Sequence, residues 1–168
     1  MLEALLFVAA LADPAAAGDC PARLADLLAR PAAVLADREA AGRMFGETNF
    51  EAVEVAPTVR TERHVSVRYR LAFDEARAVF SQPAAGGPER LVELDLYATR
   101  RELPLPVPFG AGEGELTARL GEPARLELPS ASERRLVWVC ETATGESSVA
   151  FRFADGALAG VEWRLAPD

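Results

Sequence analysis

The stretch that decides the fold is PFGAGEGELTARLGEP, residues 108–123. Its glycines indicate a flexible lead-in, and Leu116 and Leu120, four residues apart, share one face of a predicted helix. Gly121 can adopt the left-handed conformation that ends a helix, and Pro123 prevents the helix from continuing. After this point the hydrophobic pattern changes from helical spacing to alternation, so we expect only strands in the rest of the chain.

The residues after this helix predict a meander of four antiparallel strands. Alternating apolar residues mark four segments, at 125–128, 134–140, 148–153 and 160–165, with a tight-turn signal at Asp155-Gly156. The segment 134–140 is apolar on both faces, which is typical of a central strand or of one covered on both sides.

The first half of the chain also begins with helices and continues with strands. Leucines at helical spacing predict a helix that starts at Cys20-Pro21 and ends at Pro31, and a second helix over 32–44. Four later segments have a strand pattern: 50–55, 64–73, 76–80 (a short strand or one turn of helix) and 91–98.

The two halves echo each other in the order of their elements. The helix stop at 45–48 matches that at 120–123, and the last strand at 92–96 matches that at 161–165. A duplication explains this, but alternating strands also resemble one another by default. We predict an α+β fold with helices packed on an antiparallel sheet, as two tandem helix-plus-meander units. The predicted units are 18–99 and 110–168, joined by a proline-rich connector, 100–109, of extended conformation.

The N-terminal residues have the parts of a secretory signal peptide. An apolar run at 5–12 is followed by Pro14 and by AAA at 15–17, so we interpret residues 1–17 as the signal, with cleavage after Ala17. The basic start of such a signal is missing, and a short buried helix is the alternative. We therefore expect a periplasmic or secreted protein, or a cytoplasmic one if this segment is not cleaved. The residues before Cys20 lack the pattern that a lipid anchor requires.

The chain has two cysteines, Cys20 and Cys140, whose role depends on the compartment. In an exported protein we expect them to pair as a disulfide. In the cytosol they would be two small buried apolar residues. Two cysteines and a single histidine are too few for a zinc site, so no metal is expected.

The overall charge limits the classes of partner. The formal net charge is −8 and the pI is about 4.8, which argues against nucleic acid and against anionic membranes, because both require clustered cations. The apolar N-terminal run is too short to span a bilayer, so no stable membrane insertion is expected.

The sequence offers no catalytic residues and no cofactor site. His64 is the only histidine, and no nucleophile is paired with it. The spacing of Gly110, Gly112 and Gly114 resembles a phosphate loop only superficially, because it follows prolines and contains no lysine. Trp138 falls on the apolar side of its predicted strand, as Trp163 at the end of the chain also does, so both are expected in the core.

One face of the predicted sheet is the remaining candidate site. The outward residues include arginines and an aromatic, which are enriched at protein-recognition surfaces. Charges paired across strands are the alternative, since any water-exposed sheet uses them. The candidate partner-binding residues are Arg68, Arg70, Tyr97, Arg152 and Arg164.

Several short motifs carry a family resemblance. They are Leu94-x-Leu96-Tyr97, Leu103-Pro104, Pro108-Phe109-Gly110, Leu116-Thr117, Leu120-Gly121-x-Pro123, Trp138, Phe151-x-Phe153 and Gly156-x-Leu158. Over residues 91–165 the chain resembles the SmpA/OmlA and β-lactamase-inhibitor-protein-like group of bacterial proteins. The resemblance implies helices on an antiparallel sheet and a non-enzymatic role, as in envelope assembly factors, inhibitors and immunity-like proteins. The chain departs from the pattern in its acidic lead-in at 112–115 and in the missing lipobox, and the second departure argues against an outer-membrane lipoprotein.

Together these observations predict a non-catalytic protein-binding module that acts on another protein through an exposed sheet face, with the loops around Gly110 to Gly114 as the alternative docking surface. An inhibitor, an immunity protein and an envelope assembly factor all fit. The alternative is a small-ligand-binding protein or hydrolase with a pocket between two sheets that involves His64, and a third is a structural domain without a specific site.

Overall fold

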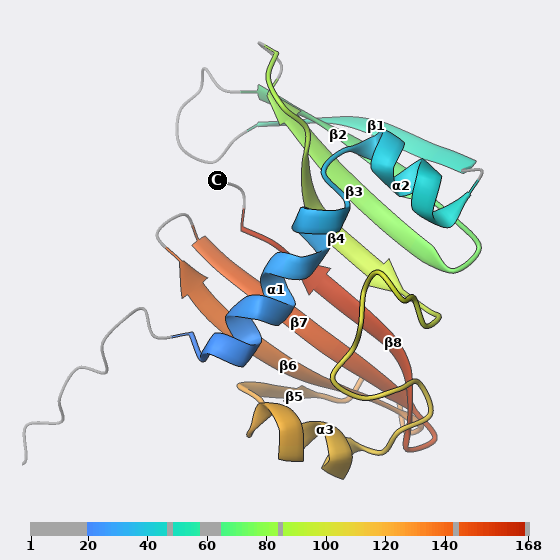
Figure 1. Cartoon of the computed structure of the whole chain (residues 1–168), viewed down its shortest axis with the longest axis vertical. Helices are drawn as coiled ribbons and strands as arrows, with labels where there is room; N and C mark the ends of the chain where they lie inside the picture. Colours follow the sequence, from blue (N-terminus) through green and yellow to red (C-terminus); the bar gives the residue numbers. More distant parts are fainter. Residues whose placement is uncertain (1–19, 47–48, 58–64, 84–85, 143–144, 167–168) are drawn as a thin grey trace, which may run out of the picture.

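The computed structural model describes residues 20–46, 49–57, 65–83, 86–142 and 145–166. Within these ranges, three helices lie on one side of an eight-stranded antiparallel sheet (Figure 1). The predicted α+β class, with helices packed on an antiparallel sheet, is confirmed. His64 and the predicted signal segment 1–17 lie outside the described residues.

Both halves of the chain contribute a meander to the same sheet. The strands are β1 (Asn49–Pro57), β2 (Val65–Ala72), β3 (Ala76–Pro83), β4 (Arg90–Leu96), β5 (Arg125–Glu127), β6 (Glu133–Thr142), β7 (Gly145–Ala154) and β8 (Ala157–Arg164). Their order is β1-β2-β3-β4-β8-β7-β6-β5, so β4 and β8 join the two meanders. Leu94 pairs with Trp163 and Leu96 with Val161. The segments predicted as the last strands of the two halves therefore meet in the middle of one continuous sheet.

The helices are α1 (Ala22–Val34), α2 (Arg38–Phe45) and α3 (Glu113–Leu120). α1 crosses the sheet and packs against β4, β6 and β7, whereas α2 lies over β3 (Figure 1). Leu24, Leu27 and Leu28 of α1 and Leu116 of α3 are buried against the sheet. This is the amphipathic pattern from which the helices were predicted.

The prediction that Pro31 ends the first helix is wrong. α1 continues through Pro31 to Val34. Proline has no N–H, so the carbonyl of Leu27, four residues earlier, loses its usual helical donor. The indole Nε1–H of Trp163 in β8 donates to this carbonyl at 3.2 Å in a buried contact. A tertiary hydrogen bond thus replaces the missing helical one.

The second helix is also shorter than predicted, because residues 32–34 belong to α1. α2 begins after Asp37, whose side chain accepts the backbone N–H of Ala40 at 2.7 Å as an N-cap. The guanidinium of Arg38 lies over the Tyr69 ring, 3.7 Å from its centroid, and its Nε donates to Glu89 at 2.8 Å. Arg38 therefore fixes α2 to the first meander.

The proline-rich connector lies on the helix side of the sheet and leads into α3 (Figure 1). Its Leu103 and Val107 are buried in the core. The N–H of Gly110 donates to the carbonyl of Leu158 at 2.9 Å, and the N–H of Leu158 donates to Ala111 at the same distance. At the far end of α3, Gly121 has a φ of 82°, which confirms the predicted helix stop.

Cys20 and Cys140 form a disulfide, with 5.2 Å between their Cα atoms. Cys20 precedes α1 and Cys140 lies in β6, so the bond ties the start of the helix to the sheet. No described helix is long and apolar enough to cross a membrane.

Candidate functional site

The sheet surface opposite the helices, which we call the open face, carries the predicted site residues. No helix in the described part of the chain covers it (Figure 1). Because successive side chains of a strand point to opposite faces of the sheet, the residues that alternate with the core-facing ones point to the open face. On β4 and β8 these are Glu93, Asp95, Glu162 and Arg164.

Arg152 lies across the middle of the open face. A Cβ at Gly160 would lie 2.9 Å from one of its guanidinium nitrogens, so the absence of a side chain at Gly160 lets Arg152 rest on β8. The guanidinium carbon is 5.7 Å from the centre of the Tyr97 ring, and Nη1 is 3.7 Å from a Glu133 carboxylate oxygen. Arg152 therefore joins Tyr97, which directly follows β4, to the start of β6.

Arg164 is the centre of an ion-pair network on the same face as Arg152. Its Nη1 donates to Asp95 at 2.6 Å, while Nη2 is 3.5 Å from Glu162 and Nε is 3.7 Å from Glu93. Burial opposes the charge on Arg164, but the hydrogen bond and charge of Asp95, with the charges of Glu93 and Glu162, outweigh it and raise the pKa of its guanidinium. Arg135 extends the network, because it pairs with Glu162 as well.

Tyr97 combines exposure with a perturbed hydroxyl. The residue is 38% exposed, more than the aromatic residues of the core. Partial burial raises the pKa of the Tyr97 hydroxyl, and the charge of Asp95 adds to this effect. The phenol is neutral at physiological pH, as tyrosine usually is, and can act as a hydrogen-bond donor.

The structure brings two of the five predicted binding residues, Tyr97 and Arg152, into contact. Arg164 lies on the neighbouring strand β8, but four residues beyond Gly160, the pairing partner of Arg152, which is roughly 13 Å along the strand. Arg68 and Arg70 lie on β2, which β3 separates from β4, roughly 14 Å from the strand of Arg164 at the usual strand spacing. All five residues point to the same face, but they do not form one cluster.

Other chemistry is limited in the described residues. No group of three or more His, Cys, Asp and Glu side chains there could hold a metal ion. The lead-in to α3 does not form a phosphate cradle, because the N–H of Gly110 is bonded to Leu158 and Glu113 pairs with Arg134 at 3.1 Å. The described strands form one sheet, so they offer no pocket between two sheets, and the role predicted for His64 stays untested.

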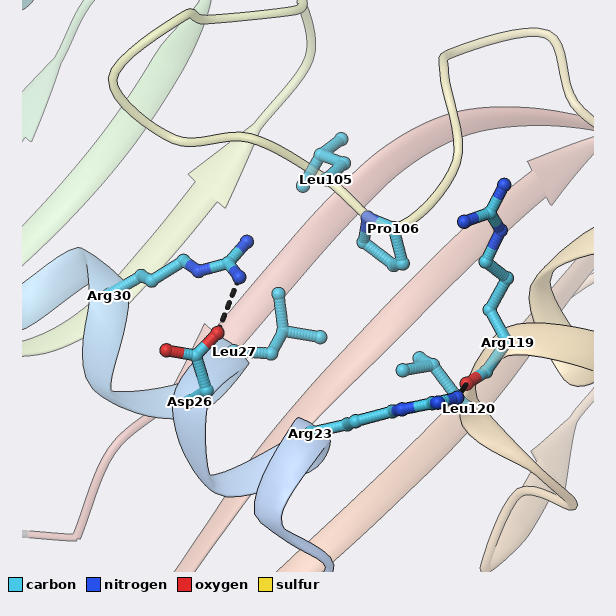
Figure 2. Close-up of a pocket in the computed structure, with 8 residues that line it drawn as sticks. All are labelled: Arg23, Asp26, Leu27, Arg30, Leu105, Pro106, Arg119 and Leu120. Atoms are coloured by element: carbon cyan, nitrogen blue, oxygen red, sulfur yellow. Dashed lines mark hydrogen bonds and ion pairs between the residues drawn. The ribbon is translucent and has the colours of Figure 1, made fainter.

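A hollow of about 360 Å³ lies on the helix side, between α1, the connector and α3. We call it the arginine pocket, because its charged lining residues are Arg23, Arg30, Arg119 and Asp26 (Figure 2). Sequence reasoning missed it. Arg23 and Arg30 are seven residues apart and so share one face of a helix, which was a usable signal. Nothing in the sequence pattern indicated that Arg119, from a distant helix, would lie opposite them.

The fold and the open face define an α+β protein that presents one side of a continuous antiparallel sheet. Comparisons of the chain with models of protein families, with curated proteins and with solved structures found no match for it.

Proposed function

We propose that this chain is a non-catalytic protein-binding module that docks a partner protein on its open face, around Arg152. The observation that carries the proposal is the position of Arg152, laid over Gly160 between Tyr97 and Glu133. Arginine and tyrosine are among the residues that contribute most to the affinity of protein interfaces.

The ion pairs on this face support binding, because they already restrict side chains that would otherwise lose conformational entropy when a partner binds. Arg164 is held by Asp95, Glu93 and Glu162, and its side chain is still 41% exposed. An arginine already fixed in one geometry loses less side-chain freedom when it enters an interface. Since cations and carboxylates alternate across the strands, the complementary partner is a protein surface of mixed charge.

We also propose that the protein is exported and acts in the periplasm or outside the cell. The disulfide between Cys20 and Cys140 supports this, because such bonds persist in oxidising compartments. The similarity of the motifs to SmpA/OmlA and β-lactamase-inhibitor-protein-like proteins favours an inhibitor, immunity or envelope-assembly role.

Site-specific photocross-linking tests the docking surface. A benzoylphenylalanine replacing Tyr97 keeps an aromatic group on the open face, and the same residue replacing Arg43 places it on exposed α2, on the helix side. After irradiation in a periplasmic extract of the source organism, we expect a discrete protein adduct from position 97 alone. Arg152→Gln in the position-97 protein should weaken that adduct.

The control for folding is the thermal unfolding midpoint of each variant, which should match that of the parent protein. Adducts of equal yield and identity from positions 97 and 43, or none from position 97, would refute docking on the open face.

A further inference from the structure

We infer that the arginine pocket binds a small organic anion, a carboxylate carried on an apolar body. This goes beyond the proposed function, because the pocket lies on the helix side of the sheet and the open face on the other. The inference rests on three observations: an excess of positive charge, guanidinium groups with free hydrogen-bond donors, and an apolar floor.

The charge of the pocket is opposite to that of the chain. Three guanidinium groups and one carboxylate, that of Asp26, give a local surplus of two positive charges in a protein of net charge −8. Clusters of one sign raise the local concentration of ligands of the other sign. An anion entering this hollow is therefore attracted locally even though the whole protein is acidic.

Two of the arginines retain donors for an incoming anion. Arg30 is already occupied, since it pairs with Asp26 and its Nη1 donates to the carbonyl of Pro104 at 2.6 Å. Arg23 uses Nη1 for one bond, to the carbonyl of Arg119 at 3.3 Å. The guanidinium of Arg119 has no carboxylate partner among the described residues. Planar guanidinium groups bind carboxylates with paired hydrogen bonds, so these two groups are the expected anion contacts.

The floor of the pocket supplies apolar contact. Figure 2 shows Leu27 and Pro106 between Arg30 on one side and Arg119 on the other. Leu27 is buried, while Leu105 of the connector is partly buried, as Leu120 is too. The volume of 360 Å³ lies in the range of small-molecule sites.

The connections between the walls indicate that the pocket is formed before any ligand enters. Arg30 links α1 to the connector through Pro104, and Arg23 links α1 to the end of α3. The disulfide at Cys20 fixes the start of the same helix. A ligand then pays little for organising the site, which favours binding of a small molecule.

The test uses 4-phenylbutyrate as the probe, because its size matches the pocket, and 4-phenylbutanamide as its neutral equivalent. Titrations followed by backbone-amide NMR should show the acid shifting signals of α1 and α3, with a dissociation constant on the order of millimolar. The amide should bind about tenfold more weakly, since it forfeits the charge-assisted bonds. Inorganic phosphate should also bind more weakly than the acid because it lacks the apolar body.

Three variants locate the site and give opposite signs. Arg119→Gln should weaken binding of the acid about tenfold. Asp26→Asn should strengthen it about fivefold, because it removes the competing carboxylate and frees Arg30. Arg43→Gln, the same substitution on exposed α2, should leave the affinity unchanged.

Each contrary outcome overturns the inference. Equal affinity for the acid and the amide would show that the carboxylate makes no charge-assisted contact. Equal affinity for phosphate and the acid would show that the apolar floor does not contribute to binding. Equal effects of Arg119→Gln and Arg43→Gln, or weaker binding by Asp26→Asn, would place the site elsewhere. The unfolding midpoints of the variants test whether each remains folded. Because the cross-linking experiment probes the opposite side of the sheet, failure of the anion site leaves the proposed docking on the open face standing.

Discussion

The hydrogen bond from Trp163 to the Leu27 carbonyl gives a sharp prediction, because Pro31 is the reason that the carbonyl is free. In the native sequence, Trp163→Phe leaves this buried carbonyl without a donor, which costs about 1–3 kcal/mol beyond the loss of packed volume. In a Pro31→Ala background, the N–H of the new alanine can donate to the same carbonyl as in any helix. The penalty for losing the indole should then largely disappear, and the two substitutions should couple by about 1–2 kcal/mol.

Urea unfolding followed by far-ultraviolet circular dichroism measures this coupling in four proteins: the native chain, the two single variants and the double variant. The loss of volume at Trp163 and at Pro31 cancels in the cycle, which leaves the shared carbonyl as the difference. Trp138→Phe is the matched control, because the buried Nε1 of Trp138 has no hydrogen-bond partner in the described residues. Coupling of zero within error for Trp163, or equal coupling for Trp138, would show that Leu27 does not depend on the indole.

Three further predictions concern stability. Replacing Cys20 and Cys140 by serine should cost about 5 kcal/mol at the loop-entropy limit for their separation of 120 residues, seen as a lower urea midpoint, and an unchanged midpoint would contradict this. The hydrogen bond from Arg38 lowers the pKa of Glu89. The stability that this ion pair gives is therefore present at neutral pH and lost as the pH falls through the folded-state pKa of Glu89. Glu89→Gln should flatten the acid side of the curve of unfolding free energy against pH. Gly121→Ala forces a side chain into a φ of 82° and should cost about 1–3 kcal/mol, measurable as a lower unfolding midpoint of a chain that keeps its helix content.

Local patterns predicted most elements of the fold, because the hydrophobic spacing that specifies each helix or strand lies within that element. Leu116 and Leu120, with Gly121 after them, specify α3 and its end. Alternation specifies β8, where Val161 and Trp163 are buried. These signals depend on periodicity alone, so they need no knowledge of the partner strand.

Long-range contacts were beyond this reasoning. A helix that runs through Pro31 is stable only because Trp163, 132 residues later, supplies the missing bond, whereas proline by itself predicts an end. In the same way, alternation predicted that Arg70 and Arg164 face one side of a sheet but not which strands separate them. The arginine pocket needs Arg119 beside α1, and such contacts between distant elements leave no local pattern.

α1 is the element in which the fold and the arginine pocket meet. A 13-residue helix without a side-chain cap at Pro21 is marginal in isolation, so its position depends on tertiary anchors. The structure supplies three along its length: the disulfide near its start, the Trp163 bond at Leu27, and the bond from Arg30 to Pro104 near its end. Because Arg30 lines the pocket and Leu27 forms its floor, the groups that stabilise α1 also set the spacing of the walls. Substitution of Trp163 should therefore change anion affinity without touching the pocket, whereas charge changes on the open face should leave the affinity unaltered.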